Sequence, residues 1–331
     1  MHESLGDPHE YILQALVATA KGHDAATAGD QLAQQVGFKL LIAFVAKLHV
    51  LALADNVVHV APRGQTVAQA IHKLDLMGLG TSEYEMAMAR KIVEHVASVE
   101  MVAICNTGSE AVMGCMRLAR TATGRSKVAF FSGSYHGIFD EVIVRATKKG
   151  KAYPAAPGIL PNTSENVLIL DYGTPEALEA IRANADELAA VLVEPVQSRR
   201  PALQPREFLH ELRALTEKSG TALVFDEVIT GFRTGPKGAQ GFFGIEADLA
   251  SYGKVVGGGY PLGVIAGKSR FMDGFDGGHW QFGDDSIPTA GVTYFAGTFV
   301  RFPMALAAAK AVLQRLEEEG PQLQERMNER T

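Results

Sequence analysis

One lysine stands out in this sequence because of the residues on either side of it. In "LASYGKVVGGGYPLG", Lys254 follows a short apolar run, and the glycine triplet 257–259 follows it almost at once. Taken alone, this stretch is more typical of a solvated strand end before a flexible turn. The alternative is an amine held for covalent chemistry, beside small residues that leave room for a bound group.

Two acids occupy the end of another apolar run. Asp226 and Glu227 lie near the end of "TALVFDEV", where a buried carboxylate is costly unless a cation or hydrogen-bond donors satisfy it. A structural pairing of Asp226 with Arg233, from the following "TGFR", is one interpretation. Strand alternation sends the two acids to opposite sides, however, so Glu227 is available for that arginine and Asp226 can face a site.

A candidate anion loop and an aromatic side chain complete the set. In "NTGSE", Gly108 permits a tight turn and a helix begins at once, so exposed amides and the hydroxyls of Thr107 and Ser109 can bind an anion. An ordinary helix-capping turn is the alternative. In "SYHG", Tyr135 offers either core packing or a flat face on which a planar ligand can stack.

Together these groups match what pyridoxal phosphate (PLP) requires of a protein. A lysine amine forms a Schiff base with its aldehyde, and a carboxylate keeps its pyridine nitrogen protonated so that the ring acts as an electron sink. An amide-rich loop holds the phosphate and an aromatic face stacks on the ring. No single motif specifies this cofactor, but the four in this order along one chain do.

These residues need a sheet to bring them together, because each follows a short apolar run. Strands are predicted at "MVAIC", "KVAFF", "NVLIL", "LAAVLVEP", "TALVFDEV" and "LASYG", alternating with helical patterns such as 83–96, 109–121 and 206–219. Such alternation predicts an α/β fold with a mostly parallel sheet covered by helices. Ligands of such sheets bind outside the carboxyl ends of the strands, so the candidate residues are expected at one edge.

Composition excludes several other classes of protein. The chain has 331 residues and a net charge of -6, which argues against nucleic-acid or membrane partners. Its two cysteines, Cys105 and Cys115, fit no metal or disulfide spacing and favour a cytoplasmic setting. The amino terminus lacks a signal-peptide layout. The apolar segment 40–54 is too short to span a bilayer, and it is predicted as a buried helix or, alternatively, an interface helix.

Six segments taken together resemble the class III (ω-type) PLP-dependent aminotransferases of fold type I, in particular the glutamate-1-semialdehyde 2,1-aminomutase-like branch. They are "CNTGSEAVMGCMRLARTATGR", "SGSYHG", "VEPVQ", "VFDEVITGFR", "GIEADLASYGKVVGGGYPLG" and "FAGTF". The stretch "GGHWQFGDDSIPTAGVTYFAGTFVR" further resembles the aminotransferase modules of polyketide–peptide synthetases. Those modules aminate a β-keto acyl chain tethered to a carrier protein.

The resemblance implies a role for each motif residue and no metal site. Lys254 would be the Schiff-base lysine and proton carrier, and Asp226 the partner of the ring nitrogen. The remaining cofactor contacts would be Gly108 and Ser109 at the phosphate, Tyr135 and Val228 on the two ring faces, and Glu194 with Glu227 near the ring. Thr298 would reach the phosphate of a neighbouring subunit, which implies a homodimer.

The resemblance also implies a domain organisation, with two departures from the family pattern. Residues 76–302 correspond to the PLP-binding large domain. Residues 1–75 form an atypical helical or irregular segment, and residues 303–331 begin a C-terminal segment that stops early. The family's small C-terminal domain is therefore expected to be missing, and the chain is expected to be part of a larger polypeptide.

Several functions remain open at this point. The main hypothesis is a transaminase that moves an amino group between an amino donor and a keto, aldehyde or β-keto acyl acceptor, either a free small molecule or a carrier-tethered chain. The alternatives are a glutamate-1-semialdehyde 2,1-aminomutase, another PLP reaction such as decarboxylation or racemisation, and an impaired fragment that serves as a PLP-binding dimerisation module. The presence of both Lys254 and Asp226 argues against the last.

Overall fold

The computed structural model describes residues 83–147, 151–279 and 285–330. The chain divides into two compact units, Met1–His59 and Val60–Thr331, and every described residue belongs to the second. The helix expected at 40–54 and the atypical segment 1–75 lie outside the described residues.

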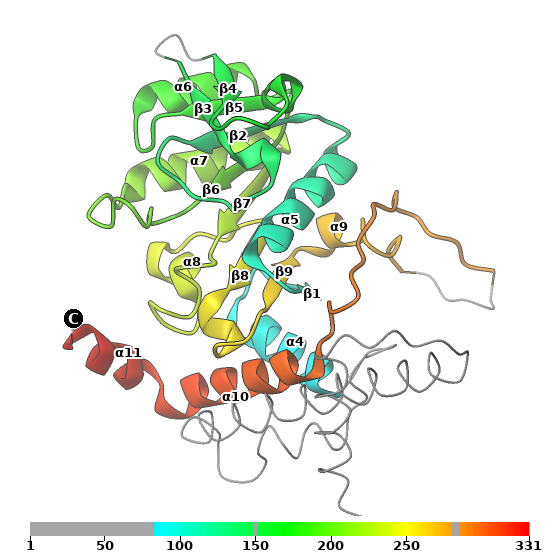
Figure 1. Ribbon diagram of the computed structural model, residues 1–331, viewed down its shortest axis with the longest axis vertical. Coiled ribbons are helices and arrows are strands. Elements are labelled where there is room, and N and C mark those ends of the chain that lie inside the picture. Colours follow the sequence, from blue (N-terminus) through cyan, green and yellow to red (C-terminus); the bar gives the residue numbers. More distant parts are fainter. Residues whose placement is uncertain (1–82, 148–150, 280–284, 331) are drawn as a thin grey trace, which may run out of the picture. The chain divides into compact units, whose positions relative to one another are not determined.

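A seven-stranded sheet forms the centre of the described unit (Figure 1). In spatial order its strands are β1 (Met101–Cys105), β9 (Gly263–Gly267), β8 (Leu249–Gly253), β7 (Ala222–Asp226), β6 (Leu188–Val193), β2 (Lys127–Phe131) and β5 (Val167–Leu170). Neighbouring strands from β8 to β5 pair in parallel, whereas β9 is antiparallel to both β1 and β8. The predicted α/β fold with a mostly parallel sheet is confirmed.

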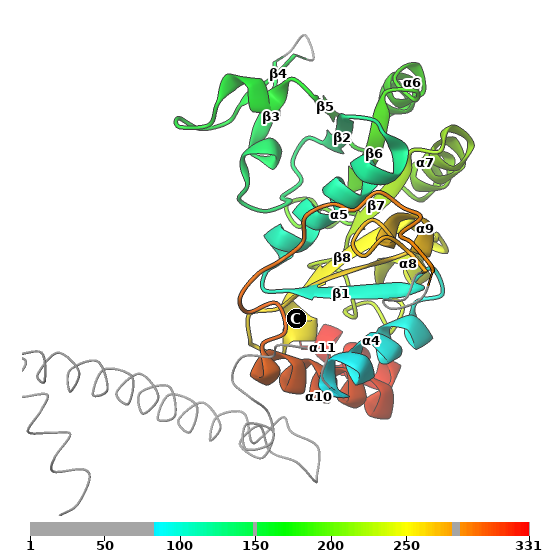
Figure 2. The same ribbon diagram turned by 90° about the vertical axis from the view of Figure 1, so that its right-hand side faces the viewer.

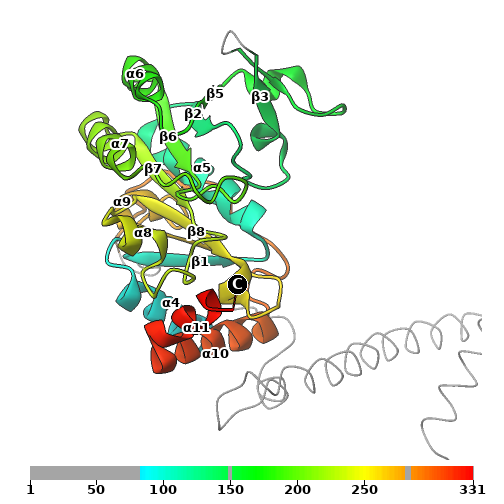
Figure 3. The ribbon, with the colours of Figure 1, turned by 90° about the vertical axis from the view of Figure 1, so that its left-hand side faces the viewer.

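Helices cover both faces of this sheet, as Figures 2 and 3 show from opposite sides. Helix α5 (Gly108–Thr123) packs on one face, and α6 (Pro175–Ala183), α7 (Arg206–Ser219) and α8 (Gly238–Phe243) pack on the other. All residues of β6 and β7 are buried, which explains why these strands read as continuous apolar runs. A short helix, α9 (Ser269–Met272), follows β9, and a two-stranded ribbon, β3 (Val144–Ala146) and β4 (Ala152–Pro154), lies outside the main sheet.

Local capping signals set the helix ends where the sequence places them. Thr174 accepts a hydrogen bond from the Ala177 amide at the start of α6, and Pro175 occupies the first helical position. Helix α7 ends at Gly220, whose φ of 70° is left-handed and suits glycine. The end of α7 agrees with the helix predicted at 206–219.

Strand β9 was not predicted, because its short run "GVIAG" is bounded by glycines that resemble a turn. The glycines serve close approach instead. A Cβ on Gly263 would lie 2.1 Å from the carbonyl oxygen of Thr107, and one on Gly267 would lie 2.4 Å from that of Asp248. Only glycine at both ends of β9 allows this strand to fit between β1 and β8.

A third apolar cluster joins the two ends of the described unit. Helices α4 (Glu83–His95) and α10 (Pro303–Glu319) both contribute to it, together with side chains of β1, β8 and β9. Glu317 of α10 forms an ion pair with Lys91. Nε2 of His95 lies 2.9 Å from the carboxylate of Glu317, within hydrogen-bond distance. Helix α10, followed by α11 (Pro321–Asn328), thus packs in the same unit as the sheet.

Glu227 anchors the connection from β7 to α8. Its fully buried carboxylate accepts hydrogen bonds from the Ala239 amide (2.7 Å), the Gln240 amide (3.2 Å) and the Thr230 hydroxyl (3.1 Å). The interpretation that Glu227 pairs with Arg233 is wrong, since Arg233 is exposed and the donors at the start of α8 occupy the acid. Burial raises the pKa of Glu227 to about 7, although the hydrogen bonds oppose that shift.

This raised pKa predicts a fall in stability as the pH rises. Below pH 4.5 the carboxyl is protonated in both states, whereas between pH 4.5 and 7 unfolding releases a proton from it. The free energy of unfolding should therefore decline across this window, by on the order of 3 kcal/mol at about 1.36 kcal/mol per pKa unit. Thermal unfolding of the wild type and of Glu227→Gln at several pH values measures the difference.

Glu227→Gln removes the titrating carboxyl, so its free energy of unfolding should lack this decline and its difference from the wild type should change with pH. Glu211→Gln, an exposed acid on α7, is the matched control and should keep the wild-type slope. Parallel pH profiles for wild type and Glu227→Gln would contradict the assignment.

Candidate functional site

The ends of β1, β7 and β8 converge on Gly108. A Cβ on this glycine would lie 2.8 Å from Cγ2 of Val228, so only glycine permits the contact. A Cβ on Gly253, the last residue of β8, would lie 3.4 Å from Cγ1 of Val228 and 3.8 Å from the Cα of Gly108. Lys254 follows directly, so the expected phosphate loop, ring-face residue and amine meet at one edge of the sheet.

The start of α5 offers free backbone donors. Thr107 accepts a hydrogen bond from the Glu110 amide, and Glu110 accepts one from the Thr107 amide, so the two form a capping box. The amides of Gly108 and Ser109 have no acceptor in the described part of the chain. Both predicted features are therefore present at once, an ordinary cap built by the flanking side chains and two amides aimed out of the helix start.

Asp226 is buried at the end of β7, with 4% of its surface exposed. Its Oδ2 lies 2.7 Å from Nδ1 of His136, and its Oδ1 accepts hydrogen bonds from the Ser251 hydroxyl (3.1 Å) and the Val228 amide (3.2 Å). The alternative pairing of Asp226 with Arg233 is wrong, and a histidine takes the place of the arginine. These three donors fix the orientation of the carboxylate.

His136 is the residue that the sequence motifs leave without a role. Its side chain is buried, packs edge-on against Phe130 with ring centroids 5.8 Å apart, and has no partner for Nε2 among the described residues. The signal available in the sequence was its place in "SYHG" after β2. What the sequence could not supply was the pairing with Asp226, 90 residues further along.

Glu194 holds the loop that carries Tyr135. The acid is 3% exposed and accepts hydrogen bonds from the amides of Tyr135 (3.3 Å) and Ser198 (2.8 Å). Tyr135 is 48% exposed, so it is not a core side chain, and its ring is available to a ligand. Gly137, at φ 113°, brings the same loop against Ser109, where an added Cβ would lie 2.5 Å from the serine Oγ.

Lys254 begins the 3₁₀-helix η3 (Lys254–Gly257) and has a φ of 47°, in the left-handed region that is uncommon for a long side chain. It is exposed and has no hydrogen-bond or ion-pair partner within the described ranges. The glycine triplet has a different use from the one expected. Gly258 at φ 58° makes room for α10, because a Cβ there would lie 2.8 Å from Cγ2 of Val312.

The two cysteines are buried and free. Burial raises the pKa of Cys105 to about 12. Burial also raises the pKa of Cys115 well above its ordinary value, with the Asp226 charge as a second cause, so both cysteines stay neutral thiols. Over residues 83–147, 151–279 and 285–330, no cluster of metal-ligating side chains and no helix able to cross a membrane occurs.

Thr298 lies in an exposed turn. The turn approaches the start of α5, since a Cβ on Gly297 would lie 3.7 Å from Nδ2 of Asn106. Arg117 of α5 also donates to the carbonyl oxygen of Tyr294, at 3.1 Å. The role expected for Thr298, at the phosphate of a second subunit, stays a prediction.

Relatives of known name share this chain's sequence over most of its length. A glutamate-1-semialdehyde 2,1-aminomutase of Methanococcus maripaludis is 38% identical over 251 residues, which cover 73% of this chain and 56% of the relative. The aminomutase of Pyrobaculum calidifontis is 42% identical over 240 residues, covering 71% and 52%. The chain thus spans about half the length of the curated relatives it matches.

Solved structures share the fold. An ω-transaminase from Sphaerobacter thermophilus superimposes with a TM-score of 0.66 at 32% identity, over 76% of this chain and 58% of that one. A glutamate-1-semialdehyde aminomutase from Pseudomonas aeruginosa gives 0.62 at 28%, over 75% and 55%. The family profile described as Aminotransferase class-III matches residues 42–330. The chain belongs to the class-III aminotransferase family.

Proposed function

We propose that this chain is the cofactor-binding part of a PLP-dependent transaminase that uses Lys254 as its Schiff-base lysine. The observation that carries the proposal is the meeting of Lys254, Gly108 and Asp226 around Val228. Within the part of the chain that the structure describes, the site offers an exposed amine and two amides without partners and a buried carboxylate, which are the groups this cofactor needs. The similarity to a structure described as a transaminase with PLP bound, at 31% identity, supports it.

When bound, PLP supplies an aldehyde and a ring that withdraws electrons from the substrate. Lys254 would hold that aldehyde until the amine of a substrate displaces it, and the released Nζ of Lys254 would then carry a proton between substrate atoms. The buried carboxylate of Asp226 would accept a hydrogen bond from the ring nitrogen, and the amides of Gly108 and Ser109 would bind the phosphate. The Asp226 carboxylate and the turn at Gly108 are held by contacts within the chain.

Other residues of the site would orient the ring and exclude water. Val228 presents its methyl groups beside Gly108, and the exposed ring of Tyr135 offers an opposing face. Glu194 would act through Tyr135 by fixing its loop, which makes it a positioning residue. Glu227, which the resemblance puts near the ring, binds the start of α8 and would act only through β7.

The reaction and the assembly belong to the same proposal. Relatives named as aminomutases favour a glutamate-1-semialdehyde 2,1-aminomutase as the second candidate, and the ω-transaminase similarity favours amino transfer to a second substrate. A homodimer, with Thr298 completing the partner's phosphate site, and a carrier-tethered β-keto substrate rest on the sequence resemblance, and a cytoplasmic setting rests on the cysteine content.

Borohydride reduction tests the role of Lys254. Incubation with PLP should give a yellow protein, and reduction followed by peptide mapping should place the label on Lys254. Lys254→Ala should lose the label and keep the fold, because the side chain is exposed. Lys237→Ala, a second exposed lysine, is the control and should label normally. A label on any other lysine would overturn the proposal.

The histidine beside Asp226 gives a second test. His136→Phe leaves the buried Oδ2 without a donor, and a hydrogen bond to a charged group is worth roughly 1.5–3 kcal/mol. We expect the affinity for PLP, measured by fluorescence titration, to fall by roughly tenfold or more. His136→Asn retains a hydrogen-bond donor and should restore part of the affinity for PLP. A side chain that served only to fill space would give no such difference between the two variants.

Equal PLP affinity in His136→Phe and the wild type would show that the pairing does not matter for the cofactor. Melting temperatures of both variants, measured without PLP, separate a general loss of stability from a specific loss of binding.

A further inference from the structure

The carboxyl ends of the parallel strands form the edge of the sheet that carries the site, here called the site edge. Acidic and basic side chains at the site edge differ in whether they have partners. The acids there are occupied by donors of their own chain, as described for Glu194, Asp226 and Glu227. The cations are exposed and have no ion-pair partner in the described ranges. They follow successive strands of the sheet, and they are Arg199 and Arg200 after β6, Arg233 after β7 and Lys254 after β8.

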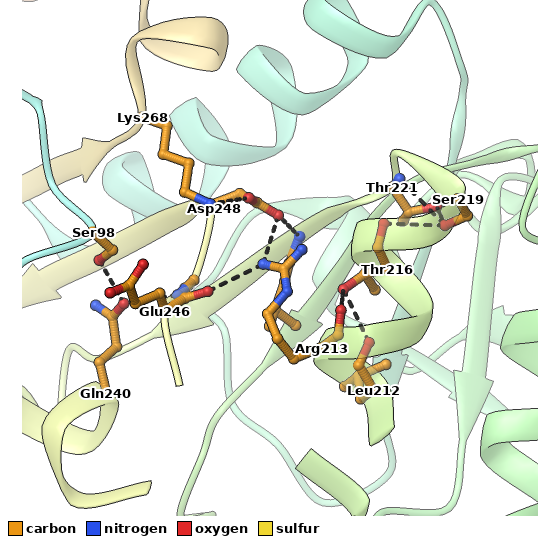
Figure 4. Close-up of polar contacts among 12 residues, drawn as sticks. Ser98, Leu212, Arg213, Thr216, Ser219, Thr221, Gln240, Glu246, Asp248 and Lys268 are labelled. Carbon is orange, nitrogen blue, oxygen red and sulfur yellow. Dashed lines mark hydrogen bonds and ion pairs between the residues drawn. The ribbon is translucent and has the colours of Figure 1, made fainter. Parts of the chain in front are cut away.

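The opposite edge of the sheet shows the contrast (Figure 4). Asp248, just before β8, binds Arg213 at 2.9 Å and Lys268 at 3.0 Å. Arg125 donates to the carbonyl oxygens of Ala185 and Leu188. Cations at that edge therefore serve the fold, whereas those at the site edge are free to attract an anion despite the net charge of -6.

The segment that precedes Arg199 and Arg200 is tied to the loop that carries Tyr135. Gln197 is fully buried, and its Nε2 donates to the carbonyl oxygen of Ser132 (3.0 Å) and to the hydroxyl of Ser134 (2.9 Å). Together with the Glu194 contacts to Tyr135 and Ser198, these bonds tie the two loops into one rim.

Gly133 in the same rim fixes the position of one guanidinium. Its φ is 89°, and an added Cβ would lie 3.7 Å from both Nε and Cζ of Arg200. The guanidinium of Arg200 therefore lies next to the space that a side chain at position 133 would fill, close to the loop that carries Tyr135.

We propose that Arg199 and Arg200 form an anion subsite for the substrate, separate from the cofactor phosphate site at Gly108 and Ser109. The subsite takes an oxyanion carried by the substrate beyond the reacting carbon, because a guanidinium group binds phosphate or carboxylate oxygens through two parallel N–H groups. The oxyanion can come from the phosphate of a carrier's prosthetic arm or from the carboxylate of a free acid. This inference rests on the proposed function and refines its substrate class.

Calorimetric titration of three probes tests the subsite. The probes are 4′-phosphopantetheine, pantetheine without the phosphate, and glutarate, each added to the protein with PLP present and absent. For a phosphate-binding subsite, 4′-phosphopantetheine should bind at least tenfold more tightly than pantetheine. The double variant Arg199→Gln/Arg200→Gln should erase that difference.

The matched control is Arg182→Gln/Lys218→Gln, which removes the same charge from exposed positions on α6 and α7. It should bind every probe as the wild type does. If only glutarate binding falls in the arginine double variant, the subsite exists and takes a carboxylate. If neither anion distinguishes that variant from the wild type, or if the control loses as much affinity, the inference is overturned.

The outcomes for the subsite and for the proposed function are separable. Failure of PLP to attach to Lys254 contradicts the proposed function, while the probe titrations without PLP still report on the arginines. Normal labelling of Lys254 in the arginine double variant, combined with unchanged anion binding, contradicts only the subsite.

Discussion

The contact between Gly108 and Val228 is the constraint on which the site depends. It presses the turn before α5 against the end of β7, with Gly253 of β8 on the other side. Any side chain at Gly108 would force these three strand ends apart and would separate the free amides from Lys254. The sheet thus supplies rigid strand ends, and one missing Cβ sets the distance between the groups they carry.

Much of the fold follows from local patterns, because short apolar strands, helix caps and glycine stops act over a few residues. The strand runs, the start of α6 and the end of α7 agree with those patterns. The site residues were found for a similar reason, since chemically distinctive side chains follow buried strands. Strand β9 was not predicted, because in the sequence the glycines that allow its close packing resemble the glycines of a turn.

The partners of buried polar groups could not be read from the sequence. Asp226 and Glu227 are adjacent, yet one pairs with His136, 90 residues before it, and the other with amides 12 and 13 residues after it. Proximity along the chain suggested Arg233 for either acid. Burial decides otherwise, because Arg233 stays in solvent, whereas the histidine and the α8 amides reach the interior and satisfy each carboxylate where it lies.

The position of Lys254 also depends on helix α10, which lies much later in the sequence. Its left-handed backbone opens a turn whose Gly258 lies against Val312 of α10. Helix α10 is in turn held to α4 by the contacts of Glu317 with Lys91 and His95. A long side chain in an unfavourable backbone region persists only where its surroundings fix it. The packing of α10 supplies that restraint, so residues after 302 help to position the amine.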